Sequence, residues 1–189
     1  MTSLSKKLLV LFLLALVGGG VYAAKQQRSI ASVQTLLEAQ TQSIAGTYRV
    51  FADRHVFPSE NSRELTQDQR KASVRVRAAY SKLSEGLSVV ERVLAISELQ
   101  VALISYMNAS LSSSASRNSE AAQMLQKELG PQGSVREQLA SYNDSARLWN
   151  AFQTTPSGAL RGQLTGGDGN ILPYLRFDGQ QEYVSIIEL

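Results

Sequence analysis

The chain has 189 residues, which suits one folded unit with appendages and is too short for two independent domains to be expected. Lysine and arginine outnumber aspartate and glutamate by 19 to 16, but without Lys6 and Lys7, which precede any expected folded region, the counts are 17 and 16. This balance argues against a nucleic-acid partner, and the absence of cysteine excludes disulfides and thiolate chemistry.

The N-terminal segment has the features of a membrane-targeting sequence. After the positive MTSLSKK, the seventeen residues Leu8–Ala24 carry no charge. At about 1.5 Å per residue they span roughly 25 Å, the lower edge of what crosses a bilayer. Residues 1–25 are therefore predicted to be a retained anchor, with cleavage as a signal sequence after Ala23 as the alternative. Lys6 and Lys7 favour the cytoplasmic side, so the bulk of the chain is expected outside the cytoplasm.

Residues 26–54 are predicted to form the first helix after the anchor. Its apolar residues recur at spacings of three, four and seven, with polar Gln40 and Thr41 where the apolar seam skips a turn. These seam residues are Ile30, Val33, Leu37, Ile44, Tyr48 and Phe51. The stretch His55–Leu65 breaks the period and is predicted to be a connector.

A second helix is predicted to begin at Thr66-Gln67-Asp68-Gln69, which fits a capping box. Its apolar arc is broad and continues to Met107, so the helix is expected at the centre of a bundle, with Gly86 as the place for a bend. One side of the arc comprises Val76, Tyr80, Leu83, Leu87, Val90, Leu94, Val101 and Ile104, and the other Val89, Val93, Ile96, Leu103 and Met107. The serine-rich residues 108–116 are predicted to be a loop.

A third helical segment with Ala121, Met124, Leu125 and Leu129 on one face is interrupted at Gly130–Gly133 because Pro131 lacks an amide proton. Ser134–Glu137 then fits a second capping box, and the restarted helix keeps Leu139, Tyr142, Ala146, Trp149 and Phe152 on one face to about residue 153. The fold class predicted for residues 26–155 is all-α, an antiparallel bundle of three to four long helices.

Residues 156–189 form a glycine-rich tail. Within it, Pro173–Ile187 carries Asp178-Gly179 between two β-leaning runs, a common hairpin signal. A two-stranded hairpin is marginal in water, so this one is expected to dock on the bundle or on a partner.

The stretch YNDSARLWN repeats an aromatic residue followed by asparagine after seven residues, at Tyr142-Asn143 and Trp149-Asn150. Two interpretations are open. The rings belong to the core and the amides face solvent, or the amides fix a neighbouring backbone at a helix contact. On residue types alone, the first is favoured.

This stretch resembles the late helix of the LemA family of bacterial membrane-anchored helical proteins. The matching residues are Tyr142, Asn143, Ala146, Trp149, Asn150, Pro156 and Ser157, with the Leu-Gln-rich run Gln123–Leu129 upstream and Pro173-Tyr174 downstream. The resemblance covers residues 115–177, while the family's Arg-rich run followed by Leu-Ile-Pro-Asn-Leu is not present, so the resemblance implies a divergent member. It implies a helical bundle at the bacterial membrane, without catalytic residues to carry over, in which Asn143 and Asn150 are structural amides.

Enzymatic functions find little support in the residue types. His55 is the single histidine, so neither a histidine-based metal cluster nor a Ser-His-Asp arrangement can be built within the chain. It is expected to be an exposed loop histidine. Glu85, Glu91 and Glu98 are interpreted as a solvated helix face and Gly166–Asn170 as a flexible turn, and no cofactor is expected.

The one dense basic region comprises Arg70, Lys71, Arg75, Arg77 and Lys82. It is interpreted as a solvated helix face, with contact to anionic lipid headgroups or an acidic partner as the functional alternative.

The sequence therefore predicts a non-enzymatic, single-pass scaffold of the bacterial inner membrane, with the bilayer contacted through Leu8–Ala24 and an envelope protein as partner. A homo-oligomer stays open. The alternative function is a periplasmic or secreted sensor or ligand-binding bundle, released by cleavage near Ala23.

Overall fold

The computed structural model describes residues 31–60, 65–112, 123–124, 127–128, 133, 135–155, 171–176 and 181–182. The chain divides into two compact units, Met1–Leu36 and Leu37–Leu189. Residues 31–36 of the first unit are helical. The predicted membrane segment Leu8–Ala24 lies outside the described residues, and no helix within them is both long and apolar enough to cross a bilayer.

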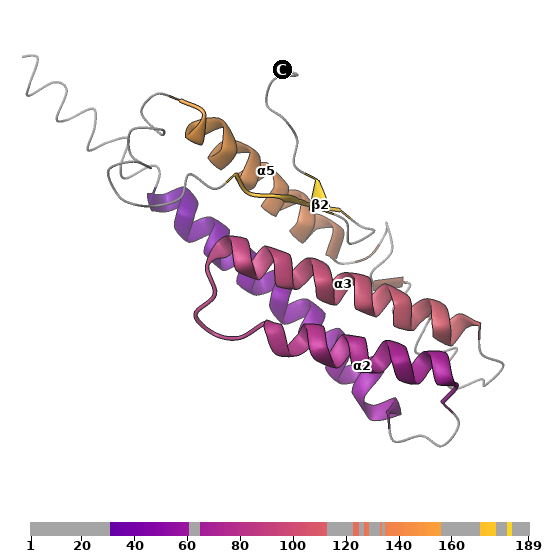
Figure 1. The fold of residues 1–189 in the computed structure, drawn as a ribbon. Helices are drawn as coiled ribbons and strands as arrows, with labels where there is room; N and C mark the ends of the chain where they lie inside the picture. Colours follow the sequence, from indigo (N-terminus) through magenta and orange to yellow (C-terminus); the bar gives the residue numbers. More distant parts are fainter. Residues whose placement is uncertain are drawn as a thin grey trace, which may run out of the picture. The chain divides into compact units, whose positions relative to one another are not determined.

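The described part of the second unit is mainly helical, which confirms the predicted all-α bundle in outline (Figure 1). Residues 37–51 are helical and continue into the π-helix η1 (Ala52–Val56) and the 3₁₀ helix η2 (Phe57–Ser59). The remaining elements are α2 (Gln67–Lys82), α3 (Val89–Leu111), α5 (Val135–Gln153), β1 (Tyr174–Leu175) and β2 (Gln181–Glu182). Residues 123–124 and 127–128 are also helical.

The first helix extends beyond its predicted end. A connector is predicted from His55, but helical geometry continues to Ser59 because the Phe57 amide donates to the Ala52 carbonyl, five residues back. This wider turn changes the angular spacing of side chains, so the 3.6-residue period fails there. Upstream, the predicted apolar seam is buried at Leu37, Ile44, Tyr48 and Phe51, whereas Val33 is half-buried and Ile30 lies outside the described residues. Thr41 fills the gap in the seam by donating its hydroxyl to the Leu37 carbonyl at 2.9 Å.

The second predicted helix is two helices. The capping box at Thr66 and Gln69 is present as predicted, but α2 ends at Lys82 and α3 begins at Val89. Gly86, expected at a bend, has a φ of 84° in the turn between them, a conformation that favours glycine. A further capping box, which was not predicted from the sequence, joins Ser88 and Glu91 at the start of α3.

Because of this turn, side chains before and after it do not follow one continuous helical period. The single apolar seam predicted from Val76 to Ile104 is therefore partly wrong. Leu94 and Val101, predicted to be core, are 36% and 48% exposed. The buried residues of α3 include Val93, Ile96 and Leu103, which were predicted for the second side of the arc. Helix α2 lies antiparallel beside α3, with Gln69 opposite Ser110 and Lys82 opposite Glu98. The buried large apolar residues of α3 are Val93, Ile96, Leu99, Leu103 and Tyr106.

The late helix has the predicted extent, because α5 ends at Gln153. Before it, Gly133 approaches the Glu128 carbonyl so closely that an added Cβ would lie 1.8 Å from the oxygen, so this position requires glycine. Ser134 of the predicted capping box lies outside the described residues. In the C-terminal tail, β1 and β2 pair antiparallel, with Tyr174 opposite Glu182 and Leu175 opposite Gln181, while Asp178-Gly179 is not described.

Candidate functional site

Two asparagines of α5 bind the backbone of the extended segment at residues 171–176. The Asn150 amide donates to the Leu172 carbonyl at 2.8 Å and accepts from the Leu172 N–H at 2.7 Å. The Asn143 amide does the same with Leu175, at 3.0 and 2.9 Å. Each side chain therefore satisfies both backbone groups of one residue, as a neighbouring strand would. We call these two residues the amide clamp.

The spacing of the amide clamp matches the spacing of its two targets. Seven residues of α-helix rise about 10.5 Å, and three residues of extended chain span about 10 Å. The order is reversed, since the earlier asparagine binds the later leucine. The segment consequently runs antiparallel along α5, as the yellow trace beside the orange helix in Figure 1 shows.

Neighbouring side chains form hydrogen bonds with other backbone carbonyls of the segment at residues 171–176. The Tyr142 hydroxyl donates to the Pro173 carbonyl at 2.8 Å, and Pro173 has no N–H that would need an acceptor. From α3, the Gln100 side chain donates to the Arg176 carbonyl at 2.8 Å. With the Leu172 and Leu175 side chains buried, the segment is held by both apolar contact and backbone hydrogen bonds.

The structure therefore changes the interpretation of YNDSARLWN. Solvent-facing amides are wrong for Asn150, which is 1% exposed. Tyr142 and Ala146 are buried as the core interpretation requires, while Trp149 is half-buried. The amides fix a backbone, but it belongs to an extended segment rather than a helix. The matching intervals Asn143–Asn150 and Leu172–Leu175 are the sequence signal that could have identified this contact.

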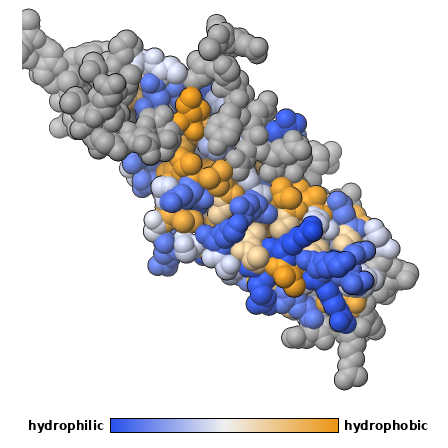
Figure 2. Space-filling model, viewed as in Figure 1, coloured by the Kyte–Doolittle hydropathy of each residue, from blue (hydrophilic) through white to orange (hydrophobic). Residues whose placement is uncertain are grey.

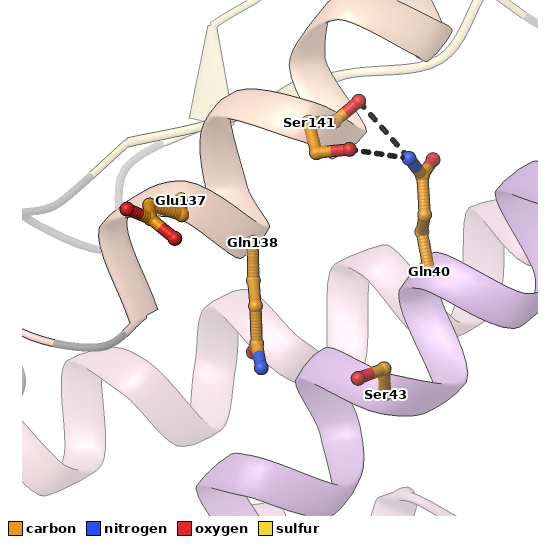
Figure 3. Close-up of a pocket in the computed structure, with 5 residues that line it drawn as sticks. All are labelled: Gln40, Ser43, Glu137, Gln138 and Ser141. Carbon is orange, nitrogen blue, oxygen red and sulfur yellow. Dashed lines mark hydrogen bonds between the residues drawn. The ribbon is translucent and has the colours of Figure 1, made fainter.

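A polar pocket of about 250 Å³ lies between the first helix and α5, lined by Gln40, Ser43, Glu137, Gln138 and Ser141. Gln40 donates to the Ser141 hydroxyl at 2.8 Å and to its carbonyl at 3.2 Å (Figure 3). Its other amide atom, Oε1, is buried with no hydrogen-bond partner among the described residues.

Both walls of this pocket carry the same residue pattern. Gln40, Ser43 and Thr47 on the first helix repeat as Gln138, Ser141 and Ser145 on α5. Thr47 donates to the Gln138 side chain at 3.2 Å, so the glutamine of each helix bonds a hydroxyl residue of the other. These neutral amides and hydroxyls can bind a ligand through hydrogen bonds, whereas Glu137, the one charged lining residue, points away from Gln138 in Figure 3.

Three of the five predicted basic residues are paired with acids of the same chain. Lys71 lies 4.0 Å from Asp68, Arg77 bonds Glu60, and Lys82 bonds Glu98. The hydrogen bond and charge of Glu60 raise the pKa of Arg77, whose guanidinium also lies over the Phe57 ring. Arg70 and Arg75 are exposed on α2. Pairing within the chain thus accounts for three of the five charges, and contact of this region with an anionic surface stays a prediction.

The single histidine is not the exposed loop residue that the sequence predicts. The His55 side chain is 12% exposed, and its Nε2 lies 3.9 Å from Glu128 Oε2. The π-turn places it in a helix against the bundle instead of in a connector. Glu85, Glu91 and Glu98 are exposed as predicted. In the described part of the chain, no three histidine or carboxylate residues are arranged to hold a metal ion.

Comparison of the chain with family models, with curated proteins and with solved structures finds no match. The resemblance to the LemA family accordingly stays a prediction that rests on the residues quoted for it. The function of the chain is therefore inferred from the geometry of the second unit and from the apolar sequence of residues 8–24.

Proposed function

We propose that the chain is a non-enzymatic helical-bundle scaffold of the LemA type, tethered to the bacterial inner membrane by Leu8–Ala24 and presenting its bundle to an envelope partner. The observation that carries the proposal is the amide clamp. Asn143 and Asn150 direct four hydrogen bonds to the backbone of Leu172 and Leu175 and so hold the chain in shape.

The chemistry of the clamp supports a holding role. Primary amides and hydroxyls donate and accept hydrogen bonds, but they do not exchange protons near neutral pH as a general acid or base must. The clamp also joins residues 22 and 32 positions apart, which fixes the surface formed by α5 and the segment at residues 171–176. A fixed surface lowers the ordering cost of binding a partner.

The first experiment tests the tether. The intact mass of the protein is measured separately from membrane and soluble fractions. The proposal expects a full-length chain in the membrane fraction only. A soluble mature chain that begins at Ala24 or Lys25 would overturn it and favour the released ligand-binding bundle.

The second experiment tests the role of the clamp. Envelope proteins are cross-linked to the full chain and to the N143A/N150A double variant, with Asn108→Ala as the control because Asn108 is an exposed asparagine of α3. Loss of the cross-linked partner in the double variant alone is expected. Equal capture by all three proteins would show that the clamped surface is not the one presented.

The released ligand-binding bundle is the second candidate function. It is favoured by the pocket between the first helix and α5, because the amide and hydroxyl side chains that line this pocket can form hydrogen bonds with a ligand. The same mass measurement decides between the two candidates.

A further inference from the structure

A second cavity lies within the larger unit, where the first helix faces the turn between α2 and α3. Its volume is about 440 Å³. Gln42, Ala45, Gly46 and Arg49 line it from one face of the first helix, since they are spaced three, four and seven residues apart. The turn Leu83–Gly86 and Arg92 of α3 complete the wall.

Arg49 lines this cavity. A guanidinium carries five N–H donors, and the Nε donor of Arg49 has no acceptor among the residues the structure describes. Its Nε is buried, which costs about 1–3 kcal/mol for a donor without a partner. The Arg49 guanidinium lies over the Tyr80 ring, 5.4 Å from the ring centre, in a cation–π contact.

Arg92 is fixed in position but not saturated. It donates to the Glu38 carbonyl at 3.4 Å, to the Thr41 hydroxyl at 3.2 Å and to the Leu87 carbonyl at 3.0 Å. Three of its five donors are thereby used, and two remain. The residue thus brings a second, rigidly held positive charge to the wall of the cavity.

Gly46 keeps the floor of the cavity open. Glycine inside a helix is less favourable than alanine by about 1 kcal/mol. Close packing does not explain it, because a Cβ built at Gly46 meets nothing within 4 Å. The absence of a side chain at Gly46 therefore leaves open space, which no neighbouring backbone occupies.

The charges around the cavity favour an anion. Two arginines, Arg49 and Arg92, line the cavity, and the one acidic lining residue is Glu85, which is exposed. Burial raises the pKa of Tyr80 and the Asp53 carboxylate raises it further, while Arg49 acts in the opposite direction. Tyr80 consequently stays neutral beside Arg49 and does not cancel its charge.

We propose that this cavity binds a small molecule through an oxyanion, either phosphate or carboxylate, with Arg49 as the main ligand and Arg92 as a second donor. The planar fork of a guanidinium matches two oxygens of either group. The volume lies in the range of small-molecule sites and leaves room for the body of the ligand above Gly46. This inference is independent of the scaffold function and of the membrane tether.

The test uses the full chain, purified in detergent and titrated by calorimetry with inorganic phosphate and separately with glutarate. Binding of at least one of them is expected, and Arg49→Gln should weaken it by about tenfold or more. The control is Arg75→Gln, which removes the same charge from an exposed position of α2 and should change the affinity less than about twofold. Absence of binding to both anions, or equal binding by R49Q, would overturn the proposal.

Filling the cavity gives an independent test. Gly46→Leu places a side chain in the open space and should abolish anion binding, while circular dichroism confirms that the helices remain. Gly46→Ala covers the case in which the leucine disturbs folding, because it should raise the melting temperature and weaken binding only partly. Anion binding by the folded Gly46→Leu variant at the wild-type affinity would contradict the assigned position.

A lipid headgroup carries the same phosphate group as a soluble ligand. A third experiment distinguishes binding of a lipid from binding of a soluble phosphate. Flotation with phosphatidylglycerol vesicles is compared with calorimetry using glycerol phosphate. Binding of glycerol phosphate that depends on Arg49 supports a soluble ligand. Vesicle binding that depends on Arg49, without any response to the soluble anions, would overturn the small-molecule form of the proposal.

Discussion

The α2–α3 pair and the α5 contact with residues 171–176 are held together in different ways. The two helices are adjacent in sequence and bury apolar side chains against each other and the first helix, with Leu83, Val93 and Leu103 at most 2% exposed. The second contact joins residues 22 to 32 positions apart, chiefly by side-chain bonds to backbone. On the face seen in Figure 2, exposed hydrophobic residues occur in separate groups divided by hydrophilic ones.

The two contacts of this helical unit depend on two different kinds of sequence pattern. Packing between helices is predicted from apolar periodicity, which carries a phase that any turn resets. A clamp between a helix and an extended segment is predicted from the spacing of amides, in which seven helical residues correspond to three extended ones. Substitutions in each region can show whether the two contacts also fail differently.

The largest effect is expected in the apolar pair. Leu103→Ala removes a side chain that is fully buried on α3 and should lower the free energy of unfolding by about 2–5 kcal/mol. Val101→Ala, two residues away and 48% exposed, is the control and should change it by less than about 0.5 kcal/mol. Urea unfolding followed by circular dichroism measures both. Similar losses from the two variants would contradict the phase assigned to α3.

A smaller and more local effect is expected in the amide clamp. Asn150→Ala leaves both backbone groups of the buried Leu172 without their partner, and the loss should be roughly 2 kcal/mol, limited because the segment can detach. Hydrogen exchange should accelerate at the Leu172 amide while α2 and α3 stay protected. Asn108→Ala, at an exposed asparagine, should leave exchange unchanged. Uniform acceleration across α3 would make the clamp part of the cooperative core.

The smallest effect concerns the capping boxes at Thr66 and Ser88. They differ in the residue at the third helical position, which is Gln69 in α2 and Glu91 in α3. Gln69 is buried, where a carboxylate would cost desolvation, whereas Glu91 is exposed. Hydrogen bonds from the Ser88 hydroxyl and then its amide lower the pKa of Glu91. The folded value is below the unfolded one, so this stabilisation is present above the unfolded pKa and lost as pH falls through the folded pKa.

Glu91→Gln should therefore lower the urea midpoint near pH 7 and lower it less near pH 3, because the wild-type carboxyl gains a proton as the pH falls through its folded pKa. Asp144→Asn is the control for loss of one negative charge at an exposed helical position. A shift of the same size at both pH values would show that charge on Glu91 is irrelevant to the cap.

Much of the helical fold could be predicted from the sequence. The capping box at Thr66 and the end of α5 at Gln153 are local signals, because both depend on neighbouring residues. The division of the central helix at Gly86 was missed because one glycine inside an apolar arc fits either a bend or a left-handed turn. The π-turn at Ala52–Val56 was missed because its hydrogen bonding leaves no pattern of residue types.

The candidate sites were less predictable. Tyr142 and Asn143 are singled out by the repeat, and the tail is expected to dock on the bundle or on a partner, but the prediction does not name Pro173 and Leu175 as the residues that they bind. His55 lies beside Glu128, which is 73 residues later in the sequence, so neighbouring residues could not predict this contact. The sequence does not distinguish Arg49 from other helical arginines, because the cavity that it lines forms only in the folded chain.

The amide clamp has a consequence for how this chain tolerates change. The hydrogen bonds of the clamp end on backbone atoms of Leu172 and Leu175. Tyr174 lies between these residues and is half-buried, so any side chain that fits there could replace it without weakening the clamp. A one-residue insertion between Asn143 and Asn150 would instead rotate one amide by about 100° around the helix axis and turn it away from its target. The contact is thus tolerant of substitution and intolerant of a change in length.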